Sequence, residues 1–166
     1  DRNQLNVRIH PLCIYTEGIK RISLTDMEYA ERMDSVIKLI AISKRVEDRI
    51  FARVSPAIIK KTHPLASVED VFNAIVVKGD AIGDAMFYGR GAGKLPTASA
   101  VVADVIDIVR NRESSRGIWE KKEYDNLVPF EASEARYYVR VTVRNKEEAR
   151  RIIVSRFGSV EFLQGD

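Results

Sequence analysis

The first periodic pattern in the chain is a short helical stripe that begins near residue 24; residues 1–14 have no clear period. Thr25 and Glu28 have the spacing of a capping box, in which each side chain accepts a hydrogen bond from the other residue's backbone amide. Apolar residues then recur at helical spacing. They are Met27, Ala30 and Met33. We therefore expect a short helix that ends near Asp34.

A run of β-branched and aliphatic residues follows, and it predicts a largely buried strand over residues 35–43. A polar turn at residues 47–48 separates it from residues 50–54, which have the pattern of a returning strand. Pro56 has no backbone N–H, so we expect it to limit any further ladder pairing. His63 precedes a proline, which disfavours helical backbone and predicts an extended segment or a turn there.

Two further strand-like runs, residues 71–78 and 85–88, flank a turn that holds two glycines and two aspartates. A helix is predicted after the next glycine-rich stretch, and Pro96 fits its first turn. Its apolar residues keep to one helical face. They are Ala98, Val101, Val102, Val105, Ile106 and Val109.

Residues 111–134 lose all period and gain charge, which indicates an interdomain connection. Four apolar residues in it are expected to pack on a neighbouring surface: Trp119, Leu127, Val128 and Phe130. Residues 136–143 alternate as in a half-buried strand. A helix is predicted over residues 149–157, with Gly158 as its C-terminal cap. Residues 160–163 resemble a second strand, so the C-terminal part is interpreted as one βαβ unit.

Composition narrows the class of protein. Apolar residues make up 45% of the 166 and charged residues 31%, as in a globular protein, and the net charge is only +3. Because basic and acidic residues are interleaved, nucleic acid is not an expected partner. No run approaches the roughly 18 apolar residues that cross a bilayer. The lone Cys13 and the absence of a visible signal peptide favour a cytoplasmic location. The chain starts at Asp1, and we expect a fragment.

The stretch with Gly89, Gly91 and Gly93 lies between a predicted strand and a predicted helix, where glycines allow close approach of backbone to a ligand. Helix N-terminal amides would also face an anion there. The dinucleotide fingerprint would need a further glycine at position 94 or 96, and Lys94 is not followed by the Ser or Thr of a Walker loop. Spacing alone therefore favours a tight structural turn.

No pattern for a metal, a nucleophile or a carboxylate pair emerges from the sequence. His10 and His63 lie far apart and have no cysteine partners, so a metal site is not expected. Cys13 is interpreted as a packed or surface thiol. The residues alone thus indicate an α+β domain with a glycine-rich turn, followed by half of a small βαβ module.

Several separated motifs, in order, closely resemble the end of the catalytic domain of bacterial homoserine dehydrogenases. They are His63-Pro64-Leu65-Ala66-Ser67-Val68, Val71-Phe72-Asn73-Ala74-Ile75 and Gly89-Arg90-Gly91-Ala92-Gly93-Lys94-Leu95-Pro96-Thr97-Ala98-Ser99-Ala100-Val101-Val102-Ala103-Asp104. An upstream stretch, with Glu17-Gly18-Ile19 and Ile37-Lys38-Leu39-Ile40-Ala41, is similar to the family's preceding segment. The resemblance covers roughly residues 15–110.

The resemblance implies an oxidoreductase that interconverts L-aspartate 4-semialdehyde and L-homoserine with NADP or NAD, on the route to threonine and methionine. It also implies an α+β fold, with a mixed sheet covered by helices, and a homodimer formed through that sheet. A preceding Rossmann domain would bind most of the cofactor. By the same resemblance, Gly93 lies against the cofactor, and Gly91 is a weaker candidate.

Departures from the family limit what carries over. The signature Asp-Leu-x-Gly-x-Asp-x-x-x-Lys, which holds the family's catalytic lysine and substrate-binding acids, does not occur in this chain. No catalytic residue is therefore assigned, and the isolated chain is expected to be inactive. Glu17 is interpreted as a surface or turn carboxylate, because Gly18-Ile19 places it in the later segment.

Residues 135–166 resemble the first half of an ACT domain, the amino-acid-sensing module often joined to these enzymes. In the family, a Pro-Gly turn before the helix commonly contacts the amino-acid effector. Here Asn145 and Lys146 replace it, so that contact is not expected to carry over. The expected domains are thus 1–112, a partial catalytic and dimerisation domain; 113–134, a connection; and 135–166, a partial regulatory domain. The alternative is a non-enzymatic amino-acid-sensing or dimerisation module.

Overall fold

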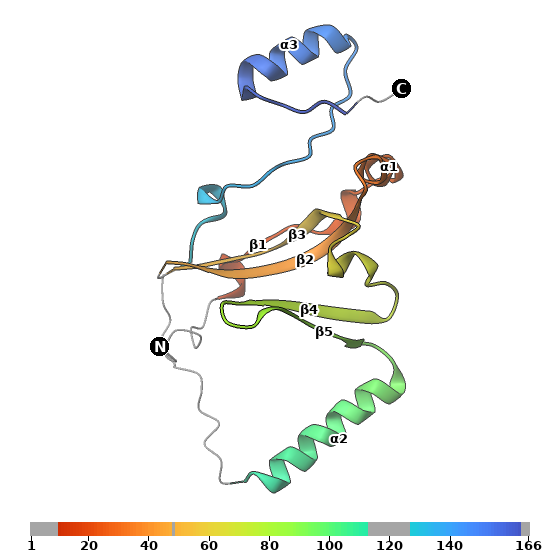
Figure 1. The fold of residues 1–166 in the computed structure, drawn as a ribbon, viewed down its shortest axis with the longest axis vertical. Coiled ribbons are helices and arrows are strands. Elements are labelled where there is room, and N and C mark those ends of the chain that lie inside the picture. The colour runs from red at the N-terminus through yellow and green to blue at the C-terminus, as the bar shows by residue number, and fades with distance from the viewer. Residues whose placement is uncertain (1–9, 48, 113–126, 164–166) are drawn as a thin grey trace.

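A computed structural model describes residues 10–47, 49–112 and 127–163 of the chain (Figure 1). A short helix precedes two pairs of strands, and two further helices follow them. Helices α2 and α3 lie at opposite ends of the molecule's long axis. The main elements are β1 (Tyr15–Thr16), α1 (Leu24–Arg32), β2 (Ser35–Val46), β3 (Arg49–Lys60), β4 (Phe72–Gly79), β5 (Gly83–Arg90), α2 (Lys94–Arg110) and α3 (Lys146–Phe157). Short 3-10 turns occur at Pro11–Cys13, Ile19–Arg21, Pro64–Ser67 (η4) and Phe130–Ala132 (η5).

The first sheet has the order β1-β3-β2 and is mixed, because β1 runs parallel to β3 while β2 and β3 are antiparallel. The β2–β3 ladder extends from Ser35 opposite Lys60 to Val46 opposite Arg49. The expectation that Pro56 limits pairing is wrong, since it lies opposite Leu39 within the ladder. Proline is compatible with a strand at an open sheet edge. In the register, β1 reaches only Arg53 and Val54 of β3, which leaves such an edge at position 56.

The N-terminal cap of α1 differs from the predicted one. Ser23 is the N-cap residue, and its side chain accepts from the Asp26 amide at 3.3 Å while the Ser23 amide donates to Asp26 Oδ2 at 2.9 Å. The capping box is real, but it lies two residues before the predicted Thr25 and Glu28. The backbone of Ser23 is still extended (φ −99°, ψ 167°), which is the geometry that an N-cap requires. The helix ends at Arg32, close to the predicted end.

Few residues of the described part are fully buried. The buried apolar residues are Ala30, Phe51 and Ala66, and the buried polar residues are Asp26, Ser35 and Ser55. The strand expected over 35–43 exists as part of β2, but its expected burial is wrong, since Leu39 is 49% exposed and positions 39–43 alternate between exposed and half-buried. One face of β2 is thus covered and the other is open.

The second sheet is the β4–β5 hairpin, which pairs Phe72 with Arg90 and Gly79 with Gly83. Both strands were expected, and β5 is longer than the predicted residues 85–88. Helix α2 follows and runs away from both hairpins (Figure 1). The predicted apolar face of α2 exists, but it is exposed along its length, with Val101, Val105 and Val109 all more than half exposed. Within the described part of the chain, no helix is long and apolar enough to cross a membrane.

The C-terminal part follows the prediction for its helix and departs from it for its strands. Helix α3 begins after Asn145, whose side chain accepts from the amides of Glu147 and Glu148, and it ends at Gly158 with φ 74°. Residues 136–143 and 160–163 form no strand. A segment becomes a strand by forming backbone hydrogen bonds with a neighbouring strand, and the described part of the chain offers neither segment such a neighbour.

The connection is held to the first sheet near its C-terminal end, as predicted. The Val128 amide donates to the Ile50 carbonyl at 2.7 Å. The ring of Phe130 stacks on Tyr15 with centroids 3.8 Å apart. Trp119, the other aromatic residue expected to contribute, lies outside the described residues. The α+β class with a mixed sheet is therefore confirmed, while the ACT-like unit stays a prediction.

Candidate functional site

The glycine-rich turn joins the end of β5 to the start of α2. The Gly91 amide donates to the Val71 carbonyl at 3.1 Å, which ties the turn back to the start of the hairpin. Gly93 is the N-cap residue of α2 and has φ 129°, a backbone conformation that only glycine adopts without strain. The Thr97 amide donates to the Gly93 carbonyl at 3.1 Å and begins the helical ladder. Pro96 falls in the first turn of the helix, as predicted.

A side chain is disfavoured at each of the two candidate glycines, Gly91 and Gly93, for a different reason. A Cβ atom at Gly91 would overlap the side-chain amide of Asn73. At Gly93 a Cβ would lie 3.3 Å from Pro96 Cδ, so the backbone angle is the stronger constraint there. By contrast, a Cβ at Gly89 would meet nothing within 4 Å. Asn73 is the residue of this turn that the sequence reasoning missed, because nothing in its spacing connects it to position 91.

The turn offers backbone donors to solvent. The first amides of a helix have no partner within it, and the aligned peptide dipoles make this end positive. Leu95, in the first turn of α2, is 80% exposed, so side chains do not cover this end. Arg90 does not extend over the turn; its guanidinium lies 5.1 Å from the centre of the Phe72 ring. The open amides and missing Cβ atoms therefore suit a flat or anionic group laid against the backbone.

Other residues considered in the sequence have local structural roles. Glu17 is exposed and accepts a hydrogen bond from the Tyr15 hydroxyl at 3.2 Å, which raises the pKa of Tyr15. His10 and His63 each accept from a backbone amide two residues further on. Cys13 is exposed. The described residues contain no group of three potential metal ligands.

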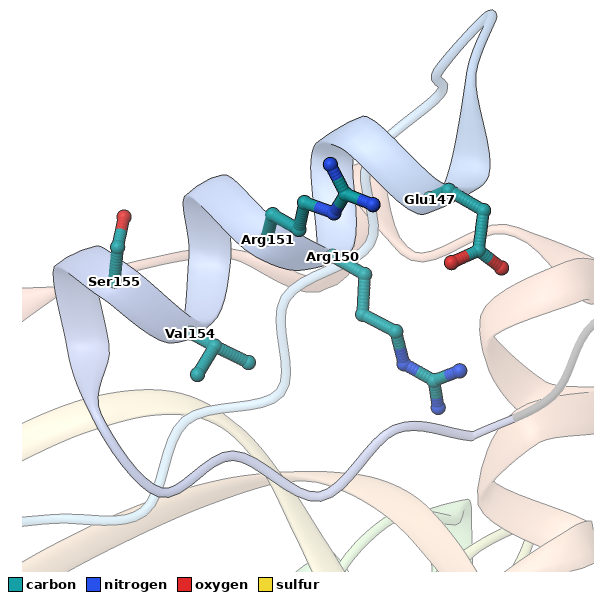
Figure 2. Close-up of a pocket in the computed structure, with 5 residues that line it drawn as sticks. All are labelled: Glu147, Arg150, Arg151, Val154 and Ser155. Carbon is teal, nitrogen blue, oxygen red and sulfur yellow. The ribbon is translucent and has the colours of Figure 1, made fainter.

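A shallow hollow lies on α3, the helix of the predicted effector module (Figure 2). Its lining residues are Glu147, Arg150, Arg151, Val154 and Ser155. Figure 2 shows Arg150 and Ser155 pointing in opposite directions from the helix, so the polar groups do not converge on one point. The Arg150 guanidinium instead lies 4.5 Å from the centre of the Phe162 ring. The described residues of this surface therefore do not form a ligand-binding site.

Comparison with known proteins agrees with the fold and with the glycine turn. The family model for homoserine dehydrogenase matches residues 2–106, which includes both hairpins and the turn. The chain belongs to the homoserine dehydrogenase family. It is 40% identical to a homoserine dehydrogenase of Mycobacterium tuberculosis strain H37Rv, over 89% of this chain and 35% of the relative. A Synechocystis homoserine dehydrogenase is 53% identical over 56% of this chain and 22% of its own length.

Solved structures support the same membership. A crystal structure of a homoserine dehydrogenase from Thiobacillus denitrificans matches with a TM-score of 0.69 and 37% identity. The match covers 76% of this chain and 31% of that protein. This homoserine dehydrogenase chain therefore spans about a third of the length of the relatives it matches, and the similarity to the mycobacterial protein extends beyond residue 106.

Proposed function

We propose that the chain contributes one wall of the cofactor site in an NAD(P)-dependent homoserine dehydrogenase, which interconverts L-homoserine and L-aspartate 4-semialdehyde. The observation that carries the proposal is the side-chain-free turn at Gly93, with its positive φ, at the open N-terminus of α2 in a chain of this family. When bound, the nicotinamide cofactor would supply the hydride chemistry. The described residues around the turn would bind and orient it.

Within that site, Gly93 would let the cofactor lie against the backbone, since no Cβ intervenes. Gly91 would have an indirect role, because its missing Cβ makes room for Asn73 and so fixes the path of the turn. The free amides of the first turn of α2 would donate hydrogen bonds to polar groups of the ligand. The remaining contacts, including those that select NADP or NAD, would come from a Rossmann domain.

Two assays test the proposal. The 166-residue chain alone, mixed with aspartate semialdehyde and NADPH, is expected to show no turnover above background, because the catalytic lysine signature is not in its sequence. A chimera, in which this chain replaces the matching segment of the mycobacterial relative, is expected to turn over. In that chimera Gly93→Ala should lower kcat/KM at least about tenfold, whereas the matched control Gly89→Ala should leave it unchanged. Equal activity of the two variants would contradict the assignment of Gly93.

The hairpin supports a proposal for the oligomer. Ile75 and Phe87 lie opposite each other in the β4–β5 ladder, and each is 65% exposed. Val77 lies on the same face, and a monomer rarely exposes contiguous apolar surface of this kind. We infer that the catalytic-domain sheet pairs two copies of the protein. Sedimentation should show a dimer that Ile75→Glu dissociates and that Lys78→Gln preserves; a monomer in all three cases would refute the inference.

The proposed domain limits are residues 1–112, 113–134 and 135–166, the last as a partial ACT-like module. The alternative function, a non-enzymatic amino-acid sensor, depends on that module. Calorimetry with threonine and with methionine tests it directly, since a sensor should give saturable heat with one of them. The absence of heat with both would leave the oxidoreductase as the better proposal.

A further inference from the structure

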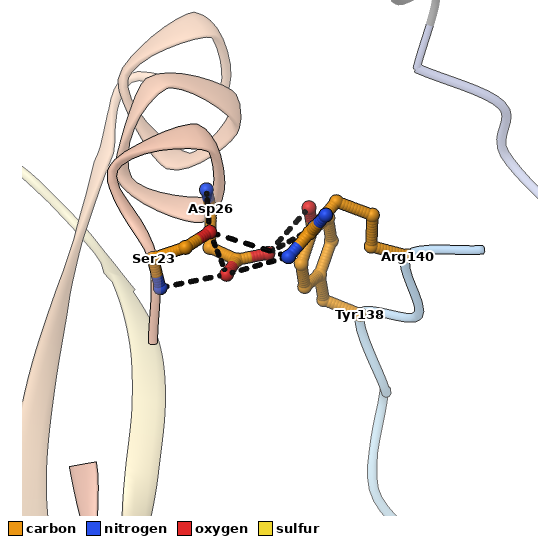
Figure 3. A network of polar contacts seen from close by, with 4 residues as sticks. All are labelled: Ser23, Asp26, Tyr138 and Arg140. Carbon is orange, nitrogen blue, oxygen red and sulfur yellow. Dashed lines mark hydrogen bonds and ion pairs between the residues drawn. The ribbon is translucent and has the colours of Figure 1, made fainter. Parts of the chain in front are cut away.

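A polar cluster joins the start of α1 to segment 136–143 of the C-terminal part (Figure 3). We call it the α1 clasp, and its members are Ser23, Asp26, Tyr138 and Arg140. Arg140 Nε donates to Asp26 Oδ1 at 2.7 Å, and the Tyr138 hydroxyl donates to the same oxygen at 3.2 Å. Arg140 Nη2 reaches Asp26 Oδ2 at 3.4 Å and Ser23 Oγ at 3.2 Å. The partners are more than 110 residues apart in sequence.

The centre of the clasp is a buried anion. The Asp26 side chain is 8% exposed, while that of Arg140 is 42% exposed. Hydrogen bonds from Arg140 and from Ser23 hold the pKa of Asp26 well below its usual range. Burial, together with the neighbouring Asp26 carboxylate, raises the pKa of Tyr138. Asp26 is therefore charged in the folded protein, and its charge is balanced mainly by a residue of the C-terminal part.

The clasp uses one side of segment 136–143. Tyr138 and Arg140 are two residues apart, and both reach Asp26 Oδ1, so they project toward the same side. The other side is apolar and exposed, with Tyr137, Val139 and Val141 all more than half exposed. The Tyr138 ring also lies 6.2 Å from that of Tyr29, on α1. Segment 136–143 thus meets α1 through polar groups and leaves its apolar face open.

The same carboxylate is also part of the capping box of α1. At its other end, α1 is tied to the end of β3, since Lys61 pairs with Glu31 and Lys60 Nζ donates to the Met33 carbonyl at 2.6 Å. The helix therefore connects the C-terminal segment at its first turn with the β2–β3 hairpin at its last. Loss of Arg140 would leave a buried anion with only local partners, which costs more than loss of an exposed pair.

We propose that the α1 clasp is a releasable strap, which couples the position of residues 136–143 to the order of the first turn of α1. Docking pairs the Asp26 carboxylate with Arg140 and fixes the cap, whereas release leaves a buried charge without this partner and loosens the turn. The strap gives the C-terminal part a direct mechanical link to the sheet that carries β2 and β3. This coupling goes beyond the proposed enzymatic function and does not require that any effector binds.

Hydrogen exchange on the full 166-residue chain tests the strap. The amides of the β2–β3 ladder serve as the internal reference, and those of the first turn of α1 and of segment 136–143 are the readout. Arg140→Ala should raise exchange in both readout regions about tenfold, with Arg140→Lys intermediate because it keeps the charge but loses the planar fork. The matched control is Arg136→Ala, which removes an exposed arginine from the same segment and should change nothing.

A double-mutant cycle completes the test. If Asp26 and Arg140 act as one unit, the combination of Asp26→Asn with Arg140→Ala should accelerate exchange no more than the stronger single variant. Additive effects would overturn the proposal, because the residues would then act independently. Unchanged exchange of the α1 amides in Arg140→Ala would also overturn it. So would equal loss of protection in the β2–β3 ladder, because the contact would then stabilise the whole fold and not act as a separate strap.

Discussion

The two antiparallel hairpins of the chain, β2–β3 and β4–β5, have equally regular ladders and very different surroundings. The first holds Ser35, Phe51 and Ser55 as buried residues, and α1 and η4 contact it. The second holds no buried residue in the described structure. Regular backbone hydrogen bonding is thus compatible with both a packed and an open sheet. The difference lies in what covers each hairpin, and not in the quality of its ladder.

This contrast has a thermodynamic consequence. A two-stranded hairpin has marginal stability by itself in water, and it requires a packed face to persist. The β2–β3 hairpin obtains that face within the chain, whereas β4–β5 and α2 present apolar residues to solvent. We therefore expect the first to unfold with the global transition and the second to open at lower free energy. The following predictions test that difference.

The largest expected effect is at Phe51, which is 5% exposed on β3. Phe51→Ala should lower the free energy of unfolding by about 3–5 kcal/mol, because it removes a buried aromatic side chain and leaves a cavity. Phe87→Ala on β5 removes the same side chain from a position that is 65% exposed, and it should change stability by less than about 0.5 kcal/mol. Urea unfolding measures both. Equal losses would show that β4–β5 is also packed.

The next effect is at the junction of the open hairpin with α2. Gly93→Ala should cost about 1–3 kcal/mol in local stability, since alanine is strained at φ 129°. Gly89→Ala is the control, because its Cβ meets open space. Hydrogen exchange of the first turn of α2 measures the change. A Gly91→Ala variant should also loosen the turn, and adding Asn73→Ala should rescue it by removing the clash; failure of the rescue would contradict the role of Asn73.

Much of this comparison was predictable from local pattern. Runs of β-branched and aliphatic residues between turn residues gave the strands of both hairpins, and helical spacing with Gly158 as the C-terminal cap gave α3. These features succeed because propensity, capping and turn chemistry act over a few residues. The glycine turn was also located correctly, since Gly91 and Gly93 both require an absent side chain.

Long-range contacts were not predictable. Nothing in the spacing of Asp26 indicates a partner at Arg140, and the cap itself was assigned two residues late, at Thr25. Periodicity places an apolar face on β2 and on α2, but it does not reveal whether the chain covers that face. The strands expected at 136–143 and 160–163 do not form for the same reason. A strand requires a neighbouring strand for its backbone hydrogen bonds, and periodicity does not show whether the chain supplies one.

A smaller, pH-dependent effect on the free energy of unfolding is expected at Asp26, on the helix α1 that packs against the β2–β3 hairpin. Its pKa is depressed in the folded state, so the folded protein binds fewer protons than the unfolded chain between the two pKa values. Its stabilising contribution is therefore complete above the unfolded-state pKa of about 4, and it declines as the pH falls below that. Near neutral pH, Asp26→Asn should cost about 1–2 kcal/mol, with solvent screening of the half-exposed Arg140 reducing the loss.

Urea unfolding of wild type and Asp26→Asn, between about pH 7 and pH 3, measures this difference. The gap between the two proteins should narrow as the pH falls below about 4. Tyr138→Phe is a useful companion, since it removes one donor to Asp26 and leaves the ion pair in place. A gap that is constant across the whole range would mean that the Asp26 charge contributes nothing to stability.

The smallest effect should come from the ion pair on the open hairpin. Lys78 Nζ and Asp84 Oδ2 lie 4.0 Å apart across β4–β5, with side chains 76% and 62% exposed. Because both charges are well solvated, Asp84→Asn should change the free energy of unfolding by less than about 0.5 kcal/mol, and 1 M salt should not alter the result. Urea unfolding at two salt concentrations checks this. A loss above about 1 kcal/mol would mean that charge, and not a missing apolar partner, determines the stability of this hairpin.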